Sequence, residues 1–269
     1  MFAKFVLKFV PTLLTGISVG GQYALIAIGY TMVYGILRLI NFAHGDVFMV
    51  AGLVMVYASA AFPLYISIPI VLVATVILGF VIERVAYKPL RSAPRMSVMI
   101  SAIGVSYLLQ NCALYITGGL PQNYPAIPAL AKSVHILGAT TKMVTIVTPI
   151  LTLVLVVVLS LVIRYTKIGM AMRAVSKDFE TLLYFTNYQS VIPTSGSMPG
   201  LKAFVAAVFG GIGSIPGAVI GAFIIGICEN IIKALGWTTF SDAFTFVLLI
   251  LVLLIKPTGI FGEKATDKV

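Results

Sequence analysis

The stretch K-A-F-V-A-A-V-F-G-G-I-G-S-I-P-G-A-V-I-G-A-F-I-I-G, from Lys202 to Gly226, decides the class of fold. Lys202 is its only charged residue. The surrounding apolar run, residues 201–232, exceeds the length of about 20 residues that one membrane crossing needs. Helix-breaking residues interrupt its middle: Gly210, Gly211, Gly213, Pro216 and Gly217. Non-helical backbone at membrane depth is tolerated only where it is buried in protein or lines a water-filled cavity. The stretch therefore predicts a hairpin of two helices, re-entrant or spanning, in the wall of a pathway. Close helix packing without substrate contact is the alternative.

The whole chain has the composition of a membrane protein. It has 269 residues, of which 60% are hydrophobic and 10% are charged, whereas soluble domains carry roughly 25% charged residues. Further apolar runs lie at residues 9–37, 47–67, 68–86, 97–117, 143–163 and 240–255. The run at 9–37 is also too long for one crossing, and we expect Gly16, Gly20 and Gly21 to break it. The predicted fold is all-α: one domain, residues 1–269, forming a polytopic transmembrane helical bundle with broken or re-entrant helices.

Basic residues predict the orientation of the bundle. The net charge of +10 comes from short segments between apolar runs, without a basic and aromatic surface for nucleic acid. Cytoplasmic loops of membrane proteins are enriched in Lys and Arg. We therefore place residues 84–95, residues 164–177 and the C-terminus in the cytoplasm, and the nearly uncharged, proline-rich segment 118–138 outside.

One point in the chain, where a basic segment is followed directly by an uncharged one, conflicts with this topology. After S-K-D-F-E-T the chain passes directly into L-L-Y-F-T-N-Y-Q-S-V-I-P-T-S-G, which is uncharged and resembles an external loop. No segment long enough to cross a membrane separates the two. Either the second piece is cytoplasmic, or one span is missing near residues 180–183.

A second polar feature is the stretch R-L-I-N-F-A-H-G-D, residues 38–46, between two apolar runs. His44 and Asp46 are two residues apart and face different directions on a helix, so the spacing does not favour a metal or catalytic site. Asn41, Gly45 and Asp46 are typical of caps on two abutting helices. Intramembrane ionisable groups are also typical of transport routes. Asn41, His44 and Asp46 are therefore candidates for a polar helix break beside a pathway.

Two other charged segments have a structural and a functional interpretation. Residues 169–181 can form a short cytoplasmic helix that docks into a partner, or an ordinary solvated basic loop. Glu229 and Lys233 are four residues apart, which suits an ion pair on a helix surface. Membrane-edge placement of the Lys233 ammonium is the alternative.

Several motifs together resemble one family. They are G-G-Q-Y-A-L-I-A-I-G-Y-T-M-V-Y-G-I-L-R-L-I-N-F-A-H-G-D, G-M-A-M-R-A-V-S-K-D, the stretch from Lys202 to Gly221, and L-V-L-L-I-K-P-T-G-I-F-G. The chain resembles, over nearly its whole length, the membrane permeases of bacterial branched-chain amino acid ABC importers, the LivH type. The resemblance implies a non-catalytic subunit of the bacterial cytoplasmic (inner) membrane, with no cofactor. It adds Gln22 to the candidate pathway residues.

The resemblance also implies partners. These are a second, homologous permease, two cytoplasmic ATPase subunits and a periplasmic or extracellular substrate-binding protein. The segment 169–181 resembles the cytoplasmic coupling helix, with Gly169, Arg173, Lys177 and Asp178 as candidates for ATPase docking. Q-N-Y-P and Y-F-T-N-Y-Q-S-V are expected to face the binding protein. Family members carry a further apolar span after the coupling helix, at the join where the topology fails.

Two other function classes compete with this one. A secondary transporter or channel for small polar solutes, such as amino acids or urea, also uses broken helices. An intramembrane enzyme is disfavoured because the chain lacks paired acids and nucleophile–base spacing. The carried substrate, aliphatic amino acid or urea, stays open.

Overall fold

The computed structural model describes residues 2–37, 41–90, 93–124, 128–136, 139–165, 190–211, 213–256 and 258–261. The elements in chain order are α1 (Phe2–Leu37), α2 (His44–Ala61), α3 (Leu64–Ile82), the π-helical turn η1 (Glu83–Tyr87), the 3-10 turn η2 (Lys88–Leu90), α4 (Arg95–Thr117), β1 (Gln122–Asn123), α5 (Pro128–Ala131), β2 (Ser133–Ile136), β3 (Ala139–Lys142), α6 (Met143–Tyr165), β4 (Ser190–Val191), α8 (Ser197–Gly210), α9 (Ile215–Ala234), the 3-10 turn η4 (Thr238–Phe240) and α10 (Ser241–Ile255). Six of the described helices are long and apolar enough to cross a membrane, which confirms the predicted all-α polytopic bundle.

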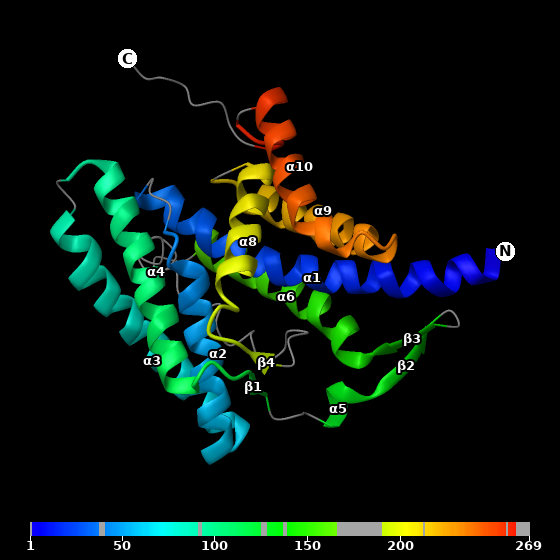
Figure 1. The fold of residues 1–269 in the computed structure, drawn as a ribbon, viewed down its shortest axis with the longest axis horizontal. Helices are drawn as coiled ribbons and strands as arrows, with labels where there is room; N and C mark the ends of the chain where they lie inside the picture. Colours follow the sequence, from blue (N-terminus) through cyan, green and yellow to red (C-terminus); the bar gives the residue numbers. More distant parts are fainter. Residues whose placement is uncertain are drawn as a thin grey trace.

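Helix α1 runs along the molecule beside α6, α8 and α9 (Figure 1). The predicted break at Gly16, Gly20 and Gly21 is wrong, because α1 is one continuous helix. These glycines instead allow neighbouring helices to approach closely. A Cβ added at Gly20 would lie 2.8 Å from Phe223 Cα of α9, and one added at Gly21 would lie 3.0 Å from Thr152 Oγ1 of α6. Small residues at such positions let helix backbones approach in lipid.

The predicted break in the run at 201–232 is confirmed. Helix α8 ends at Gly210 and α9 begins at Ile215, and the linker contains Gly211 and Gly213 with φ of 111° and 97°. These positive φ angles strongly favour glycine, since a Cβ would be strained there. The Ser214 side chain accepts a hydrogen bond from Gly217 N at 3.2 Å and caps α9, with Pro216 in the first turn.

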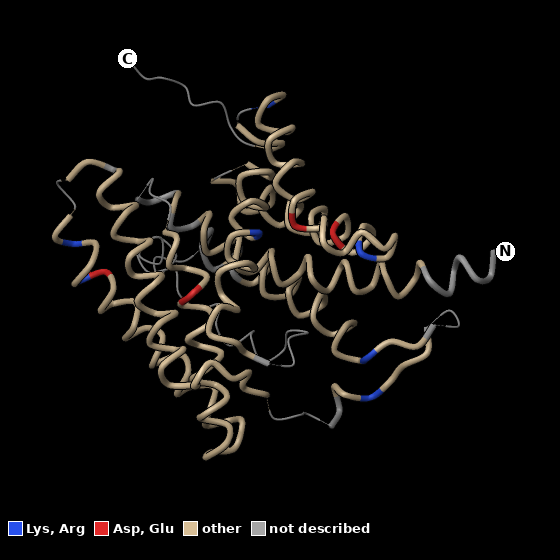
Figure 2. Tube along the Cα trace, viewed as in Figure 1, with Lys and Arg blue, Asp and Glu red and all other residues tan. Residues whose placement is uncertain are grey.

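A continuous apolar core joins α1, α2, α8 and α9. It includes Ile28, Phe48, Val205 and Ile225, all buried. In a bilayer such a core is held by van der Waals contact between close-fitting helices more than by exclusion from water. Residues of both charge signs nevertheless lie where α8, α9 and α10 meet (Figure 2). The bundle therefore encloses charge as well as apolar surface.

The short strands lie at one end of the bundle and connect segments that are distant in sequence. β1 pairs with β4 in antiparallel register, with Gln122 opposite Val191 and Asn123 opposite Ser190 (Figure 1). β2 and β3 form a hairpin directly before α6. The part of Y-F-T-N-Y-Q-S-V that the structure describes thus lies beside Q-N, so the two segments expected on the external side share one surface.

Candidate functional site

The stretch N-F-A-H-G-D, residues 41–46, covers the break before α2 and the first residues of α2, and Asn41 makes the hydrogen bonds within the break. Its Oδ1 atom accepts a hydrogen bond from Ala43 N at 3.1 Å and another from the Tyr87 hydroxyl at 2.5 Å. Tyr87 belongs to the π-helical turn that follows α3. Asn41 therefore links the segment between α1 and α2 to the end of α3 by a hydrogen bond.

Asp46 forms a second polar contact in the first turn of α2. Its carboxylate accepts hydrogen bonds from Ser106 Oγ at 2.5 Å and from Gln110 Nε2 at 3.1 Å, both on α4. The residue is only 1% exposed, and a negative charge in a first turn is favoured by the helix dipole. The capping role predicted for Asp46 is wrong, because the N-cap of α2 is Ala43 without a side-chain bond. Asp46 instead joins α2 to α4.

His44 and Gly45 join the same break to α1 and α8. The ring of His44 packs edge-on against Tyr30 of α1, with ring centroids 4.8 Å apart. Gly45 meets α8 through its backbone, since an added Cβ would lie 2.8 Å from Gly200 Cα. Gly45 is therefore a contact between helices and not a cap. The predicted site residues Asn41, His44 and Asp46 lie where α1, α2, α4 and α8 meet.

The predicted glycine segment forms the turn between α8 and α9, and the C-terminal segment closes it. The helices touch through Gly210 and Gly217, where an added Cβ at Gly217 would lie 2.5 Å from Gly210 O. Ile260 N donates to Phe209 O and Phe261 N donates to Gly210 O, both at 2.9 Å. These bonds satisfy carbonyls that the end of α8 leaves without a helical donor. Sequence reasoning did not anticipate this contact.

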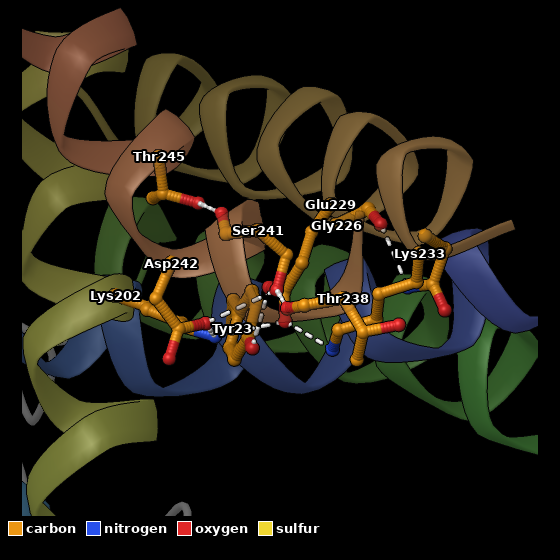
Figure 3. A network of polar contacts seen from close by, with 10 residues as sticks. Tyr23, Lys202, Gly226, Glu229, Lys233, Thr238, Ser241, Asp242 and Thr245 are labelled. Atoms are coloured by element: carbon orange, nitrogen blue, oxygen red, sulfur yellow. Dashed lines mark hydrogen bonds and ion pairs between the residues drawn. The ribbon is translucent and has the colours of Figure 1, made fainter. Parts of the chain in front are cut away.

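A third group of polar side chains, here called the charge cluster, consists of Tyr23, Lys202, Glu229, Lys233 and Asp242 (Figure 3). Lys202 Nζ lies 2.8 Å from Glu229 Oε1 and 2.6 Å from Asp242 Oδ1. Glu229 Oε1 also accepts from Lys233 Nζ at 2.5 Å, and Glu229 Oε2 accepts from the Tyr23 hydroxyl at 2.9 Å. The cluster connects α1, α8, α9 and α10.

The predicted pair of Glu229 and Lys233 is confirmed as one edge of this cluster, whereas its other members were missed. One signal was available: Lys202 is a lone cation in an apolar run, and such residues pair inside the bundle. The Lys202 side chain is 7% exposed and that of Glu229 is 1% exposed. Gln22 is buried in α1 next to Tyr23 in sequence but takes part in none of the hydrogen bonds of the three polar groups.

Gly169, Arg173, Lys177 and Asp178, and the join near residues 180–183, lie outside the described residues. Among the residues that the structure describes, no three His, Cys, Asp or Glu side chains come together in a way that could hold a metal ion.

Comparison with known proteins places these features in a family. The sequence matches the family described as "Branched-chain amino acid transport system / permease component" in two pieces, residues 12–185 and 181–253. It is 37% identical over 306 residues to the high-affinity branched-chain amino acid transport system permease protein LivH of Salmonella typhimurium, and 36% identical to LivH of Escherichia coli K12. Both alignments cover 98% of this chain and 98% of the relative.

A third relative agrees with these two. The permease protein BraD of Pseudomonas aeruginosa is 35% identical over 304 residues, covering 97% of this chain and 98% of BraD. No solved structure matches the chain. The match of the family over both halves of the chain, and relatives of this identity over nearly the full length, decide the classification. The chain is a multi-pass membrane protein that belongs to the family of permease components of branched-chain amino acid transport systems.

Proposed function

We propose that this chain is the non-catalytic permease subunit of an ATP-driven importer for branched-chain, aliphatic amino acids. The observation that carries the proposal is the identity of 35–37% over nearly the full length to three permeases named for that transport. Polar side chains at a helix break support it, namely the buried Asp46 and the half-buried Asn41 and His44, since a polar solute crossing a bilayer needs such a lining.

The importer implied by this function has several subunits. A second, homologous permease completes the path, two cytoplasmic ATPase subunits drive it, and a substrate-binding protein delivers the amino acid from outside. The basic segment 169–181, with Gly169, Arg173, Lys177 and Asp178, docks to the ATPases. The complex lies in the bacterial inner membrane with the C-terminus of this chain in the cytoplasm, which the positive-inside rule supports.

The translocation path runs beside the break between α1 and α2 and the turn between α8 and α9. Gln22, Asn41, His44 and Asp46 belong to the first wall. Four glycines and one proline form the second, at Gly210, Gly211, Gly213, Pro216 and Gly217. The non-helical residues among them, Asn41, Gly211 and Gly213, support this assignment, because irregular backbone in a membrane needs protein or water around it.

The surface formed by β1, β4 and the hairpin of β2 and β3 faces the substrate-binding protein. The pairing of Gln122 with Val191 supports this, since it joins two segments that lack charge and lie far apart in sequence.

Relative to its family, the chain lacks one apolar crossing between α6 and β4. Two observations support this. The family matches in two pieces that meet at residues 181–185, and the alignment to LivH extends over 306 positions although this chain has 269 residues. The uncharged residues 181–189 would make a helix of only about 14 Å, against about 30 Å of hydrocarbon.

Insertion tests the missing crossing. We expect uptake to rise when the apolar segment that follows the coupling helix in LivH of Escherichia coli K12 is inserted between Thr181 and Leu182. A glycine-serine insert of equal length is the control. Equal uptake with both inserts, or no gain over the original chain, contradicts the proposal.

Reconstitution tests the function itself. We expect the complex in proteoliposomes to move labelled leucine with ATP and its binding protein, and to move urea much more slowly. The ATPases should co-purify with the chain, and this should be lost in the double variant Arg173→Ala, Asp178→Ala. Uptake that persists without ATP in energised vesicles would instead identify a secondary transporter.

A further inference from the structure

The charge cluster is the most unusual feature of the described bundle. Lys202 lies within an apolar helix and is shared between two acids, Glu229 of α9 at 2.8 Å and Asp242 of α10 at 2.6 Å (Figure 3). Charges in a membrane interior are costly unless they are paired, so the cluster holds its members firmly. With Lys233 it contains two cations and two anions and is neutral as a whole.

We propose that Lys202 is a positioning residue of the transport cycle: its ammonium, held between Glu229 and Asp242, makes α8 move as one body with α9 and α10. This inference rests on the proposed function, because it assigns a mechanical role within the permease. It assigns no substrate contact to Lys202, whose ammonium is already occupied by two carboxylates.

Contacts at two positions along α8 support the proposal. Its last carbonyls, of Phe209 and Gly210, accept hydrogen bonds from Ile260 and Phe261, which follow α10 in the chain. Lys202, earlier in α8, is bound to the first turn of α10 through Asp242. Helix α8 is thus tied to α10 and the segment after it at two separate levels. Helix α8 also meets α9 directly through Gly210 and Gly217, so the described contacts join α8 to both α9 and α10.

The opposite side of α8 has a different contact. There α2 approaches through Gly45, close to Gly196 and Gly200. These glycines bring the two backbones into direct contact, and no ion pair among the described residues joins α2 to α8, whereas Lys202 joins α8 to α9 and α10. The unit formed by α8, α9 and α10 therefore moves relative to α2, and the boundary between them lies next to the polar break of N-F-A-H-G-D.

The test uses the whole complex with its ATPases, second permease and binding protein in proteoliposomes. The variants are Lys202→Met, the conservative Lys202→Arg, and the matched control Lys88→Met at an exposed lysine outside the cluster. We measure ATP hydrolysed per leucine moved, and hydrogen exchange of the α8 amides. We expect Lys202→Met to raise the ATP cost about five-fold or more and to speed exchange in α8, with Lys202→Arg close to the original.

Each outcome decides the proposal. Lys202→Met with the same ATP cost and the same α8 exchange as Lys88→Met overturns it. If Lys202→Met does not fold, Asp242→Asn replaces it, because Asp242 is 42% exposed and its loss leaves Lys202 paired with Glu229. An unchanged ATP cost and unchanged α8 exchange in Asp242→Asn also overturn the proposal. If the original complex moves no amino acid, the proposed function fails, and hydrogen exchange still judges the role of Lys202.

Discussion

Replacing Gly226 with alanine tests the contact between α1 and α9 that holds the centre of the bundle. A Cβ at Gly226 would overlap Gly20 Cα and N and would lie 2.7 Å from Gly16 O. All three are backbone atoms, which cannot rotate away. Helix α9 must therefore shift from α1, and this also strains the bond of 2.9 Å between Tyr23 and Glu229.

The expected cost follows from two opposing effects. Overpacking of this kind costs about 3 kcal/mol. Alanine in place of glycine within a helix recovers about 1 kcal/mol. The net loss is about 2 kcal/mol, which lowers the unfolding temperature by about 4–8 °C for a chain of this size.

Gly104→Ala is the matched control. Gly104 also lies inside a helix, α4, but an added Cβ there meets no atom within 4 Å. Only the gain in helix propensity of about 1 kcal/mol applies, so the unfolding temperature should rise by about 2–4 °C. Thermal unfolding of both variants in nanodiscs, followed by tryptophan fluorescence, measures the difference. Equal unfolding temperatures for the two variants would refute the reasoning that α1 and α9 meet through bare backbone.

Three further changes test the other contacts. Asp46→Asn should lower the free energy of unfolding by about 1 kcal/mol, because a neutral amide accepts a hydrogen bond from Gln110 more weakly than a carboxylate does. An SDS unfolding titration measures this change, and an unchanged midpoint contradicts the link between α2 and α4. Ile260→Pro removes the donor to Phe209 O and should cost about 1–2 kcal/mol in the same titration, whereas Ile260→Val keeps the donor and should stay close to the original. His44→Ala should impair leucine uptake or assembly in the reconstituted complex, and full uptake would leave His44 only a local role at the break.

Features that depend on neighbouring residues could be predicted from the sequence. The break at Gly211 and Gly213 follows from several glycines and a proline within one apolar run. The interruption around Asn41 follows from a polar stretch between two apolar runs. In both cases the physical cause, loss of helix propensity or of apolar character, is contained within a few residues.

Partners across the fold could not be predicted in this way. Tyr23 and Glu229 are 206 residues apart, and Asp46 and Gln110 are 64 apart. Hydropathy patterns mark which residues are buried but not which helix faces them. For this reason the sequence predicts a break at Gly16 and Gly20, whereas in the structure the backbone of α9 lies against them.

The sequence alone determined that this chain is a bundle of membrane-spanning helices, where two of its irregular segments lie, and which family it resembles, because apolar length, helix breakers and motifs are local properties. Only the tertiary structure decided that α1 stays helical through its glycines and that Lys202 lies between Glu229 and Asp242. Those outcomes depend on which helix surfaces meet, and close backbone contact and charge pairing act only between surfaces already brought together.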